Sequence, residues 1–173
     1  MCIDDEIPFE LPKGWTWSRL ASLLTRLQSG CDLKPSQYND RCEGIPYMTG
    51  ASNINNGQLI RNRWTTEPKT LAHRNDILLS CKGTVGLTAV VQDPIVHIAR
   101  QFMALQLESK TNNVCSGYVR LFIERNSARL SKNSTGLIPG IDRDSIQGLT
   151  IPLPPAAEQY RILNVLQNCL ALL

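Results

Sequence analysis

Two acidic residues and a lysine in the middle of the chain are of the types that divalent-metal chemistry needs. Asp93 is followed at nuclease-like separation by Glu108 and Lys110, and such groups can hold Mg²⁺ and orient a water molecule. However, Asp93 precedes a proline where such sites have Pro-Asp, and Glu108 lies in a polar segment typical of a solvated charge cluster. A Mg²⁺-dependent nuclease is therefore an alternative that the residue types alone leave open.

Other patterns associated with catalysis or metal binding are missing from the sequence. The segment 83–86, GTVG, lacks the lysine and serine of a phosphate-binding loop; it matches the GxxG of RNA-binding KH domains but lies between two expected strands. The six cysteines include no CxxC pair, and His73 and His97 have no zinc-ligand spacing. We expect reduced cysteines and no metal or nucleotide bound by this chain.

Segment 49–64, TGASNINNGQLIRNRW, concentrates hydrogen-bonding and basic side chains. Asparagine and glutamine can bond bidentately to adenine, arginine to guanine, and lysine and arginine neutralise phosphates. The formal net charge of +3 permits binding to nucleic acid without requiring it. Because polar loops are also the ordinary connections at a protein surface, a nucleic-acid interface and a solvated loop both remain open.

Short strands must position these loops. The strongest β signals are Ile77–Cys81 and Val85–Val91 around a Lys-Gly turn, and a third strand is expected at Gln101–Leu107. Helical spacing is expected at Trp17–Thr25 and again from Tyr118 to Arg125. We predict a mixed α/β (α+β) fold: a strand-rich domain with long polar loops, followed by a C-terminal helix.

The closing segment, IPLPPAAEQYRILNVLQNCLALL, joins a final strand to that helix. Pro154 and Pro155 cannot continue a strand ladder, but proline is favoured at the first position of a helix, where Glu158 meets the positive end of the helix dipole. Apolar residues then follow at the spacing of a coiled-coil seam, namely Ile162, Leu166, Cys169 and Leu173. Packing of this helix on its own domain is the other interpretation.

The ends and composition of the chain indicate its compartment. The sequence begins MCIDDE, acidic where a signal peptide is basic, and no apolar run approaches the roughly 18 residues of a membrane span. With 173 residues, 42% of them hydrophobic, the chain can bury the core of one domain. We expect a folded cytoplasmic protein with no membrane partner.

A series of segments, taken in order, resembles one family. They are LPKGWTWSRLASLL, SG at 29–30, GIPYMTGASNINNG, NDILLSCKGTVG, ARQFMAL, SGYVRLFI and GLIPGIDRDSIQGLTIPLPPAAEQYRI. Together they are similar to a target-recognition domain, with the start of its conserved helix, of the DNA-specificity (S) subunit of type I restriction–modification systems. The most specific piece is IPLPPAAEQYRI, followed by DILLSCKGTVG. The family often has glycine where this chain has Asn75, a turn-compatible change.

The resemblance implies a non-catalytic reader of double-stranded DNA. Residues 1–153 would form the target-recognition domain, and residues 154–173 would begin the conserved spacer and dimerisation helix. The implied partners are methyltransferase (M) subunits, an endonuclease (R) subunit and a second copy of the chain, because such subunits usually carry two recognition domains. S-adenosylmethionine, ATP and Mg²⁺ would bind to partner subunits and not to this chain.

Within that resemblance, DNA contacts are expected in the polar loops. We predict base-edge readout by asparagine and arginine and phosphate contacts by lysine. The predicted DNA-binding residues are Ser52, Asn53, Asn55, Arg61, Lys82, Arg100, Lys132 and Asn133. For each, an exposed side chain without a DNA contact is the alternative. The seam defined above is the predicted dimerisation face.

Two other functions stay open at the level of sequence. One is a recognition domain from a fused restriction–methylation enzyme, in which the same fold would act in cis. The other is the Mg²⁺-dependent nuclease using Asp93, Glu108 and Lys110. A half-size subunit and a piece of a longer protein both fit a single recognition domain.

Overall fold

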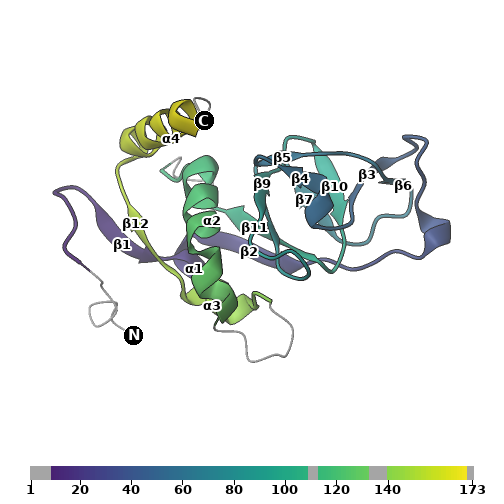
Figure 1. Cartoon of the computed structure of the whole chain (residues 1–173), viewed down its shortest axis with the longest axis horizontal. Helices are drawn as coiled ribbons and strands as arrows, with labels where there is room; N and C mark the ends of the chain where they lie inside the picture. The colour runs from purple at the N-terminus through teal and green to yellow at the C-terminus, as the bar shows by residue number, and fades with distance from the viewer. Residues whose placement is uncertain (1–8, 109–112, 133–139, 171–173) are drawn as a thin grey trace.

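The computed structural model describes residues 9–108, 113–132 and 140–170. They form an elongated molecule with most of the strands at one end, α2 (Ser116–Lys132) near the middle, and α4 (Ala156–Leu170) with one further pair of strands towards the other end (Figure 1). The predicted mixed α/β fold with a C-terminal helix is confirmed. Among the described residues, no helix has the length and apolar character needed to cross a membrane.

A central antiparallel sheet carries most of the core. In spatial order its strands are β2 (Leu24–Ser29), β11 (Phe102–Leu107), β8 (Ile77–Ser80) and β9 (Thr88–Val90). Alternate side chains of β8 and β11 point to opposite faces: Leu79 and Met103 join the cluster that includes Val119 and Ile123 of α2. Because both faces are covered, these strands are apolar without alternation.

A second four-stranded sheet covers the other face. In spatial order its strands are β6 (Trp64–Thr65), β3 (Ile45–Met48), β10 (Ile95–Ile98) and β7 (Leu71–His73). Met48 and Ile98 from this sheet pack with Leu78 and Phe102 of the central sheet in one buried cluster. The β10–β3 pair is parallel, and the other pairs in this sheet are antiparallel.

The two ends of the described chain meet in a third, two-stranded sheet. Strand β1 (Thr16–Arg19) pairs antiparallel with β12 (Thr150–Leu153), and the short helices α1 (Leu20–Leu23) and α3 (Arg143–Gly148) lie beside them. The helix predicted at Trp17–Thr25 is therefore wrong over most of its length. Trp17 lies opposite Pro152 in the strand pair, and only one helical turn separates β1 from β2.

The remaining predicted elements match the structure closely. The strand at Ile77 and the strand ending at Leu107 are confirmed, the strand predicted over Val85–Val91 is shorter, and the helical spacing after Tyr118 belongs to α2. The Tyr118 hydroxyl donates to the carbonyl oxygen of Pro152 at 2.6 Å. Burial raises the pKa of Tyr118 to about 12, so the hydroxyl remains a donor at neutral pH.

Candidate nucleic-acid interface

A tight hairpin presents the amide side chains of segment 49–64. Strands β4 (Ile54–Asn55) and β5 (Gln58–Leu59) pair antiparallel, and the turn residues Asn56 and Gly57 have φ of 48° and 75°. Two successive positive φ values define the type I′ turn that Asn-Gly favours. Asn55 lies directly opposite Gln58, and both side chains are exposed. The hairpin therefore displays a pair of amides on its outer face.

The inner side of the same hairpin is fixed to the body of the domain. Ile54 and Leu59 pack against the buried cluster between the two sheets. At the turn, a Cβ added to Gly57 would lie 2.8 Å from a terminal nitrogen of Arg120 on α2, so the backbone approaches that side chain closely. The hairpin is thus held by Ile54 and Leu59 along its strands and by the close contact with Arg120 at its turn.

Asn53 supports this hairpin from inside and cannot read a base. The side chain is fully buried, and its Oδ1 accepts hydrogen bonds from the Thr49 backbone N–H, the Thr49 hydroxyl and the Gly50 N–H. Its Nδ2 donates to the Ile60 carbonyl oxygen and to Asn62 Oδ1. The prediction that Asn53 contacts DNA is corrected: every polar atom of the side chain is used within the fold.

Arg61 follows the hairpin and is paired with Asp93. The Arg61 Nε donates to both carboxylate oxygens, at 2.8 and 3.0 Å, and only 13% of the Asp93 side chain is exposed. This pairing occupies one of the carboxylates considered above for metal binding. Within the part of the chain that the structure describes, no group of three or more His, Cys, Asp or Glu side chains could hold a metal ion, and Lys110 lies outside that part.

A second group of loops meets at Gln101. A Cβ added at Gly50 would collide with the Gln101 side chain, and one added at Gly83 would lie 3.6 Å from its Oε1. Gln101 therefore lies between the loop that carries Ser52 and the turn that carries Lys82. Ser52 and Lys82 are exposed. The structure brings together three loops from which the DNA contacts were predicted.

Lys82 and Arg100 line one hollow of about 880 Å³ beside this junction. Arg143 of α3 lines it too, and its Nη2 donates to the Leu27 carbonyl oxygen at 2.8 Å. Acidic residues offset the positive charge of these side chains. Asp142 and Asp144 also line the hollow, and Asp32 lies 2.7 Å from the Nε of Arg100. The hollow is therefore lined by hydrogen-bond donors of Lys82, Arg100 and Arg143 and by carboxylates that offset their positive charge.

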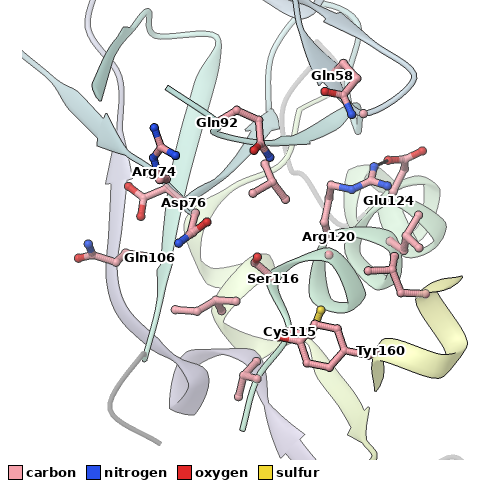
Figure 2. A pocket seen from close by; sticks show the side chains of 18 of the residues that line it. Gln58, Arg74, Asp76, Gln92, Gln106, Cys115, Ser116, Arg120, Glu124 and Tyr160 are labelled. Carbon is pink, nitrogen blue, oxygen red and sulfur yellow. Dashed lines mark hydrogen bonds and ion pairs between the residues drawn. The ribbon is translucent and has the colours of Figure 1, made fainter. Parts of the chain in front are cut away.

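A larger cleft of about 1460 Å³ is lined on one side by the β4–β5 hairpin and by residues of the central sheet, and on the other side by helices α2 and α4. Figure 2 shows Arg74, Asp76 and Gln106 on one side of this cleft, with Arg120 and Tyr160 on the other. Burial raises the pKa of Asp76, while the hydrogen bond from the His73 N–H lowers it. Amides are frequent in its lining, which includes Asn56, Gln58, Asn75, Gln92 and Gln106.

Arg120 has a structural role within this cleft. Its Nη1 lies 2.8 Å from Glu124 Oε2, and the Thr88 hydroxyl donates to the same carboxylate oxygen at 2.5 Å. Only 13% of the Arg120 side chain is exposed. This side chain therefore joins α2 to β9 and supports the tip of the hairpin.

Two predicted DNA-binding residues, Lys132 and Asn133, cannot be compared with the structure. Lys132 is the last residue of α2, but its side chain and the whole of Asn133 lie outside the described residues. Their predicted DNA contacts stay predictions. Sequence reasoning left out Gln58, Gln101 and Arg143, although the Asn-Gly turn signal places Gln58 opposite Asn55.

Helix α4 divides the predicted seam between two environments. Ile162 and Leu163 are partly buried against the core of their own domain, whereas Leu166 is 41% exposed and Cys169 is exposed. Val165, outside the predicted seam, is 54% exposed. Packing on its own domain therefore applies to the first turns of α4, and pairing of the rest with a second helix stays a prediction. Leu173 lies outside the described residues.

Comparison with known proteins gives a consistent match over nearly the whole chain. The family model for the type I restriction modification DNA specificity domain matches residues 12–172. The type I restriction enzyme EcoEI specificity subunit of Escherichia coli is 23% identical over 95% of this chain and 30% of its own length. A putative type I restriction enzyme MjaX specificity subunit of Methanocaldococcus jannaschii is 24% identical over 88% of this chain and 36% of its own length. The chain thus spans about a third of these relatives.

Solved structures show the same similarity in three dimensions. A chain from a structure of type I R-M complex assembly and conformational transition has a TM-score of 0.82 and 26% identity, over 95% of this chain and 40% of its own. The HsdS subunit from Thermoanaerobacter tengcongensis has a TM-score of 0.76 and 27% identity, over 93% of this chain and 38% of its own. The fold is thus that of one part of a longer chain in each of these structures.

Proposed function

The chain belongs to the family of type I restriction modification DNA specificity domains, and from this premise we propose that it reads one part of a DNA target and catalyses no reaction itself. The observation that carries the proposal is the family match, which runs from residue 12 to residue 172 and so includes every loop of the candidate interface and the whole of α4. The proposed ligand is double-stranded DNA.

The form of the interface supports this proposal. Recognition of a base edge needs polar side chains that are exposed but held in place. Asn55 and Gln58 meet both requirements, because they lie on the outer face of a hairpin fixed by Asn53 and Gly57. Lys82 and Ser52 extend the polar surface around Gln101 and are suited to phosphate contacts.

We propose the same division of the chain that the sequence suggests, with recognition by residues 1–153 and assembly through residues 154–173. Exposed apolar residues on α4, namely Tyr160, Val165 and Leu166, are suited to contact a second helix or a methyltransferase subunit. A second copy of the chain and an endonuclease subunit complete the proposed set of partners in the cytoplasm. S-adenosylmethionine, ATP and Mg²⁺ would act on those partner subunits.

The test is selection of duplexes from a random DNA pool by the purified chain, alone and together with the methyltransferase subunit of the same system. Enrichment of a short sequence motif is expected, with binding that weakens as salt rises. Light scattering on the same samples measures whether the chain forms a dimer or joins the methyltransferase. Binding that is equal for all sequences in both samples would refute DNA-sequence recognition.

A further inference from the structure

Two arginines of the interface each pair with an aspartate through Nε, and the Arg61 pair is the less exposed of the two. Arg61 donates from Nε to both oxygens of Asp93, and Arg100 has its Nε 2.7 Å from Asp32 Oδ2. Among the described residues, no hydrogen bond joins the terminal nitrogens of either arginine to a protein group. Each side chain is therefore fixed near its stem and leaves its outer edge available.

The aspartates are placed to fix these arginines. The Asp93 side chain is only 13% exposed and the Arg61 side chain is 46% exposed, so the carboxylate is held within the fold while the guanidinium reaches the surface. Asp32 holds Arg100 at two points, because its Oδ1 also accepts the backbone N–H of Arg100 at 3.1 Å. Fixing the guanidinium before binding reduces the conformational entropy lost when it meets a ligand.

Three other arginines of the fold use a terminal nitrogen in a contact within the protein. Arg120 commits Nη1 to Glu124, Arg143 commits Nη2 to the Leu27 carbonyl oxygen, and Arg41 commits Nη2 to Glu43 at 3.2 Å. A guanidinium whose outer edge is engaged cannot form a two-pronged contact with a new partner. Arg61 and Arg100 differ from these three arginines, because their terminal nitrogens remain available while Nε is paired with an aspartate.

The outer edge of a guanidinium matches one base in the major groove. Its two terminal N–H groups bond together to O6 and N7 of guanine, both of which are acceptors, and adenine offers a donor at the position equivalent to O6. Phosphate contacts do not require this fixed orientation, because they carry no sequence information. An arginine held at Nε with both terminal nitrogens available is suited to guanine readout.

We propose that Arg61 and Arg100 each read a guanine in the DNA target, with Asp93 and Asp32 as positioning residues. This inference rests on the proposed function and specifies it: the part of the target read by this chain contains two G·C pairs. It also gives Asp93 a role that involves no metal ion.

The experiment determines the selected DNA motif for the wild-type chain and for Arg61→Lys and Arg100→Lys, in the complex that gives the wild-type motif. Lysine keeps the positive charge but loses the planar fork. Each variant is expected to lose about 5- to 150-fold of its preference for G·C at one position, a different position for each arginine. Arg41→Lys is the matched control, since the Arg41 and Arg100 side chains are equally exposed at 71%.

The positioning role is tested with Asp93→Asn and Asp32→Asn. Each is expected to weaken the preference for G·C at the same position as its arginine partner, with the thermal unfolding midpoint close to that of the wild type. A loss of stability without a position-specific change in the motif would assign the aspartates a structural role only and overturn this part of the inference.

The outcomes separate the inference from the function on which it rests. A wild-type chain that selects no motif contradicts both. A wild-type motif that Arg61→Lys and Arg100→Lys leave unchanged overturns guanine readout while sequence recognition stands. A uniform loss of affinity across all sequences, with a smaller salt dependence, would mark the two arginines as phosphate contacts and also overturn the inference.

Discussion

The side-chain carbonyl of Gln159 accepts a hydrogen bond from the backbone N–H of Cys115 at 2.8 Å, which joins the first turn of α4 to the residue before α2. The same side chain donates from Nε2 to the carbonyl oxygens of Asn113 and Pro154, each at 2.8 Å. Gln159 is fully buried. One amide therefore fixes the place where α4 leaves the domain.

Replacing Gln159 by leucine should destabilise the fold by about 3 kcal/mol, because it leaves one buried donor and two carbonyl oxygens without their partner. Urea unfolding of the two proteins measures the difference in free energy. Gln147→Leu makes the same change at an exposed position of α3 and should shift stability by about 0.5 kcal/mol or less. Equal stability of Gln159→Leu and the wild type would contradict the role of the Gln159 hydrogen bonds in fixing the start of α4.

Asn53 and Asn55 should separate stability from recognition, although only one residue lies between them. Asn53→Ala removes five hydrogen bonds from a buried site and should cost about 2 to 4 kcal/mol in the free energy of unfolding. Asn55→Ala should change stability by about 0.5 kcal/mol or less, because the side chain is exposed.

The measurements for this pair are urea unfolding and the selected DNA motif. Asn55→Ala is expected to relax base preference at one position, since an asparagine can bond bidentately to adenine. If Asn55→Ala unfolds as easily as Asn53→Ala, the exposed amide has a structural role instead. If its motif matches that of the wild type, Asn55 does not read a base.

The hydrophobic pattern predicted those helices and strands whose buried face can be recognised from neighbouring residues in the sequence. Strand β8 and strand β11 are apolar over their buried lengths, and α2 shows helical spacing, so composition and pattern sufficed. The segment from Trp17 has helical spacing too, but pairing with β12, more than 130 residues later, makes it a strand. Tertiary pairing overrides local preference there, and no local window of sequence contains that information.

The sequence predicted which residue types the candidate site contains, but it did not predict the role of each side chain. Segment 49–64 holds the amides as expected, yet Asn53 is buried at the end of a 3₁₀ turn and Asn55 is exposed in the strand that follows. The ion pairs of Arg61 and Arg100 join residues 32 and 68 positions apart, and sequence spacing gave no sign of them. By contrast, the Asn-Gly turn at residues 56–57 is a local signal that could have defined the hairpin.

Asn75 provides a test of backbone conformation. It has φ of 73° at a turn in which the Asp76 N–H donates to the His73 carbonyl oxygen. Asparagine tolerates this region better than most residues, glycine adopts it without strain, and β-branched residues are strongly disfavoured there. Asn75→Val should therefore cost about 1 to 2 kcal/mol in unfolding free energy, whereas Asn75→Gly should be nearly neutral. Equal stabilities of the two variants in urea would contradict a strained turn.

His97 should make stability depend on pH. The ring is fully buried; its Nδ1 accepts from the N–H groups of Lys69 and Thr70, and Nε2 lies 3.1 Å from the Cys31 carbonyl oxygen. This set of partners requires the neutral tautomer with the proton on Nε2, because a proton on Nδ1 would face two donors. Burial lowers the pKa of His97 below its ordinary value of 6.5, and the nearby charge of Lys69 acts in the same direction.

The sign of the effect follows from that direction. Since the folded state binds a proton at His97 more weakly than the unfolded state, the contribution to stability is fully present above about pH 6.5 and is lost as the pH falls towards the folded pKa. Asp76, whose pKa burial raises, contributes with the opposite sign in a more acidic window near its ordinary value of 3.8. The two contributions are therefore distinguished by their sign as the pH falls, since His97 lowers the stability and Asp76 raises it.

The measurement is the free energy of unfolding from about pH 8 to about pH 5 for the wild type and for His97→Gln. Glutamine can accept and donate in the same positions without titrating, so the variant should lose less stability over this range than the wild type. If His97→Gln loses as much stability on acidification as the wild type, a group other than His97 is responsible.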